Sequence, residues 1–399
     1  MPNSNQTYII NSASKGYQMV SQESDAIPFN KPAVWGTEKK YLEQVFERGK
    51  FSGGGPFNQR CRAWLKHHYS AADVLPTTSC THALEMAAML CDLRPGDEVI
   101  LPSYAFSSTA TAFVRCGASL IFVDVEPSTM NIDPQAVAAA ITAKTRVLVV
   151  LHYAGVACDM DALLSLAEKH KLIVVEDAAH AIFARYKDRL CGTLGLFGCL
   201  SFHETKNLHC GEGGALIIND SAYLDRAEII LEKGTDRLRL RRGEVDKYTW
   251  QDIGSSYVLS ELNAAFLQAQ LDHGREITAE RLCAWQAYHE CLYPLAERGW
   301  IAIPDRAAVG EHNGHIFWVK AKDLAERTAL IAFLRARGIH SVFHYVPLHS
   351  ARAGRRYGTF VGEDQYTTRE SERLVRLPLY FGFSQTKRVV EGIKAFYSV

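Results

Sequence analysis

Short apolar runs alternate with helix-forming segments from Val74 to about His180, and this alternation constrains the fold most strongly. The apolar runs are continuous stretches of Val, Ile and Leu, such as LIVVED at 172–177, and show no apolar–polar alternation. Strands of a parallel sheet covered on both faces have this pattern. We therefore predict an α/β fold with a mainly parallel central sheet and helices on both faces. Ligands of such sheets bind beyond the carboxyl ends of the strands.

The pattern changes after Gly214. A strand and a helix are followed by a long helical region at 258–295 with an apolar stripe. From about Trp300 a smaller unit follows, with predicted strands at 315–323 and 341–348, a helix at 325–339 and a last helix at 386–398. We predict three parts: a polar leader at 1–25, a large α/β domain at 26–275, and a long helix with a small α+β domain at 276–399.

The charge balance, the cysteines and the length of the apolar runs argue against several classes of protein. Lys+Arg and Asp+Glu are equal at 44 each, which argues against a nucleic-acid binder that works by bulk electrostatics. None of the ten cysteines forms a CxxC pair, so we expect reduced thiols, no metal site and a cytoplasmic protein. No apolar run is long enough to span a bilayer, and the N-terminus lacks the pattern of a secretory signal.

Four features coincide at predicted strand ends. Asp177 closes an apolar strand, Lys206 follows another, Ser201 precedes that lysine by five residues, and Ser79 and Thr81 open a helix. Alone, each has an ordinary explanation, such as a helix cap, a turn residue or a solvated charge. Together they match the needs of pyridoxal phosphate: an amine for the Schiff base, a carboxylate for the ring nitrogen, and hydroxyl and N–H groups for the phosphate.

Other residues fit the same cofactor. Phe106 follows a strand and is placed to give the ring an aromatic wall, and Cys80 lies at the phosphate-binding helix start. The competing prediction, a dinucleotide site, lacks its glycine fingerprint, because CGEGG at 210–214 follows the lysine and FSGGGPF at 51–57 precedes the sheet.

Ten ordered motifs resemble the DegT/DnrJ/StrS-type sugar aminotransferases, of the fold-type I class of pyridoxal phosphate enzymes. The resemblance runs from about Ile27 to the C-terminus and is carried by IPFNKPAVWGTE, TTSCTHALEMAAML, PGDEVILPSYAFSSTATAF, VDVEPSTMNID, HYAGVACDMDAL, VVEDAAHA, SFHETKN, GEGGA, DIGSSYVLSELNAAFLQAQL and VFHYVPLH. It implies a homodimer with shared active sites. It also implies that Lys206 forms the Schiff base, that Asp177 pairs with the pyridinium and that Ser201 binds the phosphate.

The resemblance also implies roles for the remaining cofactor residues. Phe106 stacks on the ring, and Cys80 and Thr81 bind the phosphate through their backbone N–H groups. His180 lies near the ring oxygen or the phosphate. Two positions depart from the family pattern: Cys80 stands where a glycine is usual, and Ser256, or Ser255, stands where a second-subunit asparagine usually touches the phosphate.

Four stretches resemble the family members that aminate TDP-4-oxo-6-deoxy-D-glucose at C4: HETKN, EKGTDR, VDKYTWQDIGSSY and GEDQYTTRESERLVRLPL. The implied reaction moves the amino group of L-glutamate to C4 of dTDP-4-dehydro-6-deoxy-D-glucose. Its products are 2-oxoglutarate and a dTDP-4-amino-4,6-dideoxyhexose, of galacto or gluco configuration, for a surface polysaccharide. The alternatives are amination at C3, a dehydratase, in which histidine replaces the lysine, and a non-catalytic regulator.

Five residues near predicted strand ends are candidates for substrate contacts. His152 and Tyr153 end one strand, and His344, Tyr345 and His349 belong to the small domain, where a structural role is equally expected. The basic run RLRLRRGE at 237–244 is either a solvated face or a contact for the sugar nucleotide's diphosphate across a dimer interface.

Overall fold

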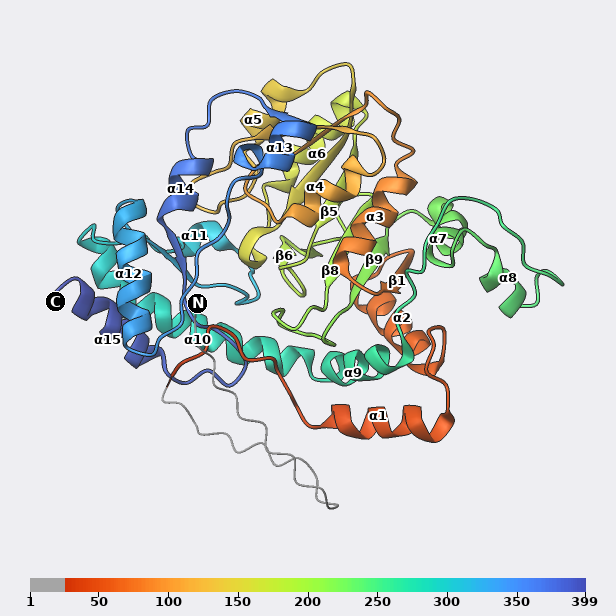
Figure 1. Ribbon diagram of the computed structural model, residues 1–399, viewed down its shortest axis with the longest axis horizontal. Helices are drawn as coiled ribbons and strands as arrows, with labels where there is room; N and C mark the ends of the chain where they lie inside the picture. The colour runs from red at the N-terminus through yellow and green to blue at the C-terminus, as the bar shows by residue number, and fades with distance from the viewer. Residues whose placement is uncertain (1–25) are drawn as a thin grey trace, which may run out of the picture.

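The structure, a computed structural model, describes residues 26–399; the polar leader predicted at 1–25 lies outside the described residues. Its centre is an eight-stranded sheet in the order β1-β9-β8-β5-β4-β2-β3-β11 (Figure 1). The strands are β1 (Asp73–Thr77), β2 (Glu98–Pro102), β3 (Ser119–Val123), β4 (Thr145–Leu151), β5 (Ile173–Asp177), β8 (Phe197–Ser201), β9 (Gly214–Ile218) and β11 (Gly358–Phe360). β9 runs opposite to the other seven. The predicted α/β class with a mainly parallel sheet is confirmed.

Successive residues of each strand are buried on opposite faces of the sheet, which explains the continuous apolar runs. Val147 and Val149 of β4 pack on the face covered by α3 (Cys80–Leu90), α4 (Ser107–Val114) and α7 (Leu224–Leu231). Leu148 and Val150 pack on the opposite face. That face is covered by α5 (Pro134–Ala140), α6 (Met160–His170), α2 (Pro56–Tyr69) and α9 (Glu261–Asp272).

Local sequence sets the helix starts that matter for the site. Ser79 is in an extended conformation and its hydroxyl accepts a hydrogen bond from the backbone N–H of His82, so it caps α3 as predicted. Asp133 caps α5 in the same way, directly before Pro134. The helix α1 (Thr37–Arg48) precedes these elements in the chain and packs along α9 (Figure 1).

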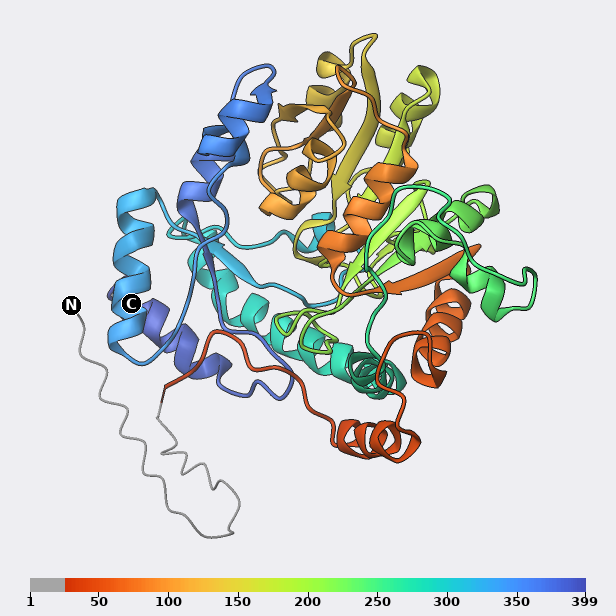
Figure 2. The same ribbon diagram turned by 45° about the vertical axis from the view of Figure 1, so that its right-hand side comes forward.

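The C-terminal part forms a second core beside the sheet domain (Figure 2). Its elements are α10 (Gly274–Glu297), α11 (Arg306–Val309), β10 (Trp318–Lys320), α12 (Leu324–Ala336), α13 (Arg352–Tyr357), α14 (Thr367–Arg373), β12 (Leu374–Arg376) and α15 (Thr386–Phe396). β10 and β12 pair antiparallel. Shorter elements complete the fold: β6 (Arg185–Tyr186), β7 (Arg189–Leu190), α8 (Arg237–Arg241) and single 3₁₀ turns at Tyr153–Gly155, Ser221–Tyr223 and Leu348–Ser350.

Three details of the second half differ from the sequence prediction. The helical region at 258–295 is two helices, because the backbone leaves the helical conformation at His273 between α9 and α10. The strand predicted at 341–348 is wrong: Val342 makes one isolated bridge to Arg376, and the segment is otherwise irregular. β11 lies after residue 275 in the sequence but pairs with β3 of the large sheet, so the chain does not leave this sheet for good at the predicted domain boundary. The boundary itself stays a prediction.

Among residues 26–399, no helix combines the length and apolar character needed to cross a membrane.

Candidate active site

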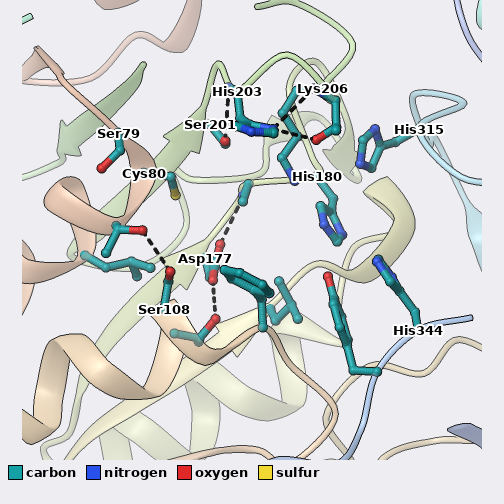
Figure 3. A pocket seen from close by; sticks show the side chains of 18 of the residues that line it. Ser79, Cys80, Ser108, Asp177, His180, Ser201, His203, Lys206, His315 and His344 are labelled. Carbon is teal, nitrogen blue, oxygen red and sulfur yellow. Dashed lines mark hydrogen bonds between the residues drawn. The ribbon is translucent and has the colours of Figure 1, made fainter. Parts of the chain in front are cut away.

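A cavity of about 620 Å³ lies beyond the carboxyl ends of β4, β5 and β8, beside the start of α3. In Figure 3, Lys206 and Asp177 lie between Ser79 and Cys80 on one side and three histidines on the other. The cavity is lined by Phe29, Ser79, Cys80, Thr81, Leu84, Phe106, Ser108, Thr109, Leu151, Asp177, Ala179, His180, Ser201, His203, Thr205, Lys206, Glu212, Gly213, His315, His344, Tyr345 and Arg376. Its position is the one that parallel sheets give their ligands.

Lys206 lies in the loop between β8 and β9. The loop is closed by backbone hydrogen bonds from Phe202 to Gly213 and from Glu204 to Gly211, and the N–H of Lys206 bonds to the carbonyl of His203. No carboxylate of the described residues forms an ion pair with this lysine. Burial, with a smaller contribution from the positive charge of Arg376, lowers the pKa of Lys206 to about 8, against the opposing effects of Cys80 and Asp177. Its amine is therefore partly neutral near physiological pH.

Asp177 is the last residue of β5 and is 3% exposed. Its carboxylate accepts a hydrogen bond from the Thr109 hydroxyl at 2.6 Å and from the backbone N–H of Ala179 at 3.1 Å. Burial raises the pKa of Asp177, while these two hydrogen bonds and the charge of Lys206 act in the opposite direction. The carboxylate is thus held in one orientation beside an amine that could act as a nucleophile.

The start of α3 forms the wall of the cavity on the side of Ser79 and Cys80. Helix N-termini carry free N–H groups and a partial positive charge, which favour phosphate. The Thr81 hydroxyl is hydrogen-bonded to the Ser108 hydroxyl at 2.8 Å, and the Ser201 hydroxyl accepts from the N–H of His203 at 3.4 Å. Gly214 makes this wall possible, because a Cβ there would lie 2.4 Å from the backbone nitrogen of Cys80.

Three imidazoles form the wall on the other side of the cavity. His180 and His315 lie with their ring centroids 4.7 Å apart, and His344 stacks on Tyr345 at 3.8 Å. Burial, followed by nearby positive charges, lowers the pKa of all three histidines, so they are neutral. Asn207 fixes His315 through a 2.8 Å contact to Nδ1.

Most of the predicted site residues meet in this cavity. It is lined by Ser79, Cys80, Thr81, Phe106, Asp177, His180, Ser201, Lys206, His344 and Tyr345. Phe106 is 59% exposed and lies at the open side of the cavity, where a bound ring would cover it.

Four predicted residues lie elsewhere. His152 is fully buried between the Glu176 carboxylate, at 2.8 Å, and the N–H of Cys158, so it stabilises the β4–β5 connection and does not line the cavity. Tyr153 is fully buried behind the cavity wall.

His349 is also outside the cavity lining, because its Nδ1 is hydrogen-bonded to the Ser103 hydroxyl at 2.7 Å. Ser256 is exposed and forms an isolated backbone bridge with Glu232. It does not line the cavity of its own chain. Its predicted contact is with a partner's cofactor and stays a prediction.

Seven polar residues of the cavity were not predicted from the sequence: Ser108, Thr109, His203, Thr205, Glu212, His315 and Arg376. Ser108 and Thr109 follow Phe106 in a helix start, a signal that was available in the sequence. His315 and Arg376 come from the small domain, and no local pattern indicates that they reach this cavity.

Comparison with known proteins identifies the family. The model of the DegT/DnrJ/EryC1/StrS aminotransferase family matches residues 33–394. Three similar solved structures are the aminotransferase TlmJ from Streptoalloteichus hindustanus (28% identity, TM-score 0.86), S. venezuelae DesV (27%, 0.85) and 3-amino-5-hydroxybenzoic acid synthase (27%, 0.83). Each alignment covers 94% of this chain, and the alignments cover 99%, 100% and 99% of those three chains.

The enzymes of this family depend on pyridoxal 5′-phosphate. The cavity fits that cofactor, since it combines a buried amine, a buried carboxylate and a free helix N-terminus. With the family model matching most of its length, this chain belongs to the DegT/DnrJ/EryC1/StrS family of aminotransferases.

Proposed function

We propose that the enzyme transfers the amino group of L-glutamate to C4 of dTDP-4-dehydro-6-deoxy-D-glucose, giving a dTDP-4-amino-4,6-dideoxyhexose for a surface polysaccharide. The observation that carries the proposal is the amine of Lys206, with its pKa lowered to about 8, in one cavity with the buried Asp177. The sugar substrate follows from the four stretches that resemble the C4-aminating members of the family, among them HETKN at 203–207.

Bound pyridoxal phosphate would supply an aldehyde for amine exchange and a protonated ring that accepts electrons. Lys206 would hold the cofactor covalently and, once displaced by the donor, would act as a base. In the first half-reaction its neutral amine would take the proton from the α-carbon of glutamate and pass it to the reacting carbon of the cofactor. In the second half-reaction the amine would take a proton back from that carbon and deliver it, as the ammonium form, to C4 of the sugar. A pKa near 8 suits both steps, because each form of the amine is then well populated.

The other residues of the cavity would orient the cofactor. Asp177 keeps the proton on the ring nitrogen, and Thr109 fixes the direction of that carboxylate. The N–H groups of Cys80 and Thr81 and the hydroxyl of Ser201 would bind the phosphate.

Phe106 would cover one face of the ring, which explains an exposed aromatic side chain at the cavity mouth. His180, neutral and fixed by the backbone N–H of Ala154, would contact the ring oxygen or the phosphate.

We further propose a homodimer with shared active sites. Trp250 and Ile253 are 81% and 55% exposed and lie just before Ser256, on the segment with α8 that projects from the molecule in Figure 1. Burying these side chains against a second copy would bring Ser256 to the partner's phosphate. A cytoplasmic location is consistent with ten free cysteines, most of them buried.

Product analysis tests the proposed reaction. The purified enzyme is incubated with dTDP-4-dehydro-6-deoxy-D-glucose and ¹⁵N-labelled glutamate, and the sugar product is examined by NMR. We expect ¹⁵N on C4, with proton coupling constants that give the galacto or gluco configuration. Label on C3 with a 3-keto substrate would indicate the alternative regiochemistry. A protein that binds pyridoxal phosphate but transfers no label to any keto sugar would contradict the proposal.

A further inference from the structure

His152 and Glu176 form a buried pair that the proposed steps do not use. Both side chains are fully buried, and neither is among the described residues that line the cavity. Glu176 directly precedes Asp177 in β5. Because side chains of a strand alternate between faces, Asp177 shares the face of Val175, which packs with α3 and α4, whereas Glu176 shares the opposite face with Val174. The pair therefore lies behind the strand end that carries Asp177.

The Glu176 carboxylate accepts four N–H groups. Its Oε1 accepts from the backbone N–H groups of Leu194 and Gly195, both at 2.6 Å. Its Oε2 accepts from the backbone N–H of Gly192 at 2.6 Å and from Nε2 of His152 at 2.8 Å. An ionised carboxylate has about four such acceptor positions, so all of them are occupied. The side chain of Glu176 is thus held from four directions.

The loop 191–195 supplies these backbone donors from a fixed position. Gly192 has a φ of 96°, a conformation that glycine adopts readily. The side-chain amide of Asn219 donates to the carbonyls of Gly192 and Gly195, at 3.1 and 2.8 Å. The loop also packs directly on β8, where a Cβ on Gly198 would lie 2.3 Å from the Gly192 carbonyl oxygen. The position of the carboxylate is therefore set by the loop.

His152 connects this anchored carboxylate to the main chain of Asp177. Nδ1 of His152 accepts the N–H of Cys158 at 3.1 Å, so the ring proton lies on Nε2 and is donated to Glu176. The backbone N–H of His152 donates to the carbonyl of Asp177 at 3.2 Å. One residue therefore holds the side chain of Glu176 and the backbone of Asp177 together.

The direction of the Asp177 carboxylate depends on where its main chain lies. Thr109 of α4 donates to this carboxylate at 2.6 Å from the side of the cavity, opposite to Glu176. A displacement of the strand end would pull the carboxylate away from Thr109 and from the cavity. Functional groups must stay within about 0.5 Å of their productive position. The pair behind the strand fixes the part of Asp177 that Thr109 does not hold.

We propose that His152 and Glu176 are positioning residues, which hold Asp177 where its carboxylate meets the ring nitrogen of bound pyridoxal phosphate. They act through Asp177 and contact neither cofactor nor substrate. The inference rests on the role of Asp177 in the proposed function. It also gives a role to a histidine that follows a strand at the correct edge of the sheet but lies outside the cavity.

The ¹⁵N chemical shift of the ring nitrogen in bound, ¹⁵N-labelled pyridoxal phosphate tests the inference without turnover, because it reports the proton that Asp177 retains. His152→Asn keeps an acceptor for Cys158 but cannot reach Glu176, so the resonance should move toward the value of the unprotonated ring. The rate of the half-reaction with glutamate should fall by about 10-fold to 100-fold, the range for removal of a partner that orients a functional side chain. His152→Gln keeps an N–H donor at the place of Nε2 and should recover most of both.

Cofactor-free protein gives a second readout. The N–H of Ala179 donates to the Asp177 carboxylate at 3.1 Å. Its hydrogen exchange should become about 10-fold faster in His152→Asn, because the acceptor is no longer held in place. Asp124→Ala is the matched control, since it also removes a carboxylate that accepts several backbone N–H groups, but those of residues 365–367. It should change neither the resonance nor the exchange of Ala179.

The possible results separate this inference from the proposed function. An unchanged resonance and unchanged exchange at Ala179 in His152→Asn would overturn it. Should that variant fail to fold, Glu176→Gln replaces it, because its new amide faces N–H donors and should shift the resonance in the same direction; no shift would again overturn the inference. Equal effects of Asp124→Ala would reduce the pair to a general stabiliser and contradict the proposal.

Asp177→Asn decides which of the two ideas fails. A ring nitrogen that stays protonated in this variant would contradict the role of Asp177 in the proposed function and, with it, the inference. A shifted resonance in Asp177→Asn but not in His152→Asn would overturn the inference alone. A resonance that depends on His152 in a protein that aminates no keto sugar would support the inference and contradict only the proposed reaction.

Discussion

The lowered pKa of Lys206 predicts how fast the cofactor-free enzyme captures pyridoxal phosphate at each pH. With a pKa of about 8, about a quarter of the Lys206 amines are neutral at pH 7.5, against about one in a thousand at the ordinary value of 10.5. Since only the neutral amine attacks an aldehyde, the rate of attachment should rise steeply from pH 6.5 and level off above pH 8.5. The physical cause is the cavity, which removes water from the ammonium form.

The assay mixes cofactor-free protein with pyridoxal phosphate, quenches with borohydride after short times, and quantifies the adduct on the peptide that contains Lys206. Lys187 serves as the internal comparison, because its exposed amine has its pKa raised by the hydrogen bond to Asp161 and should be labelled slowly throughout. Asp177→Asn removes a negative charge that favours the ammonium form of Lys206, so the midpoint of its profile should move to lower pH. A Lys206 rate that still climbs between pH 9 and 10.5 would refute the argument.

Three further predictions concern the scaffold of the site. Gly214→Ala places a Cβ against the backbone nitrogen of Cys80, so cofactor retained after gel filtration should fall; full retention would mean that β9 can shift away. Glu176→Ala removes the acceptor of three N–H groups held at 2.6 Å, two of them buried and one partly buried, and should lower the free energy of unfolding in urea by at least about 3 kcal/mol; a loss below 1 kcal/mol would contradict this. The Asp124 carboxylate accepts hydrogen bonds from the backbone N–H groups of residues 365–367, so Asp124→Ala should speed hydrogen exchange at these residues. Unchanged exchange would show that these hydrogen bonds do not hold the segment.

The sheet could be predicted from the sequence because its information is local. Most of the early strands are rich in branched apolar residues, and three of the helices that follow them, α3, α5 and α6, start with the capping residues Ser79, Asp133 and Asp159. The errors occur where tertiary contacts decide. The segment 341–348 is apolar but meets only a single bridging residue of β12, so it forms no strand. β11 is three residues long and depends on β3 for its pairing.

The same distinction explains the site. Asp177 and Ser201 could be predicted because they end neighbouring strands of one sheet, whose carboxyl ends share an edge, and Lys206 lies in the loop that follows the second of these strands. The presence of Arg376 in the cavity could not be predicted, since β12 has no strand partner in the large sheet and reaches the cavity only by the packing of the small domain.

His152 was predicted from its position after a strand but does not line the cavity. It ends β4 at the right edge, but the carboxylate of Glu176 on the adjacent strand draws its ring into the core. A position in the sequence at a strand end is therefore not sufficient to bring a side chain into this cavity.

The central claim is that the amine at position 206 carries the cofactor, and one measurement tests it most directly. Protein loaded with pyridoxal phosphate is reduced with borohydride, digested and mapped by mass spectrometry, beside a Lys206→Ala variant treated identically. The account predicts one reduced phosphopyridoxyl group on Lys206 of the wild type and none in the same peptide of the variant. An unmodified Lys206 in fully loaded wild-type protein, or a stoichiometric adduct on a different lysine, would contradict it.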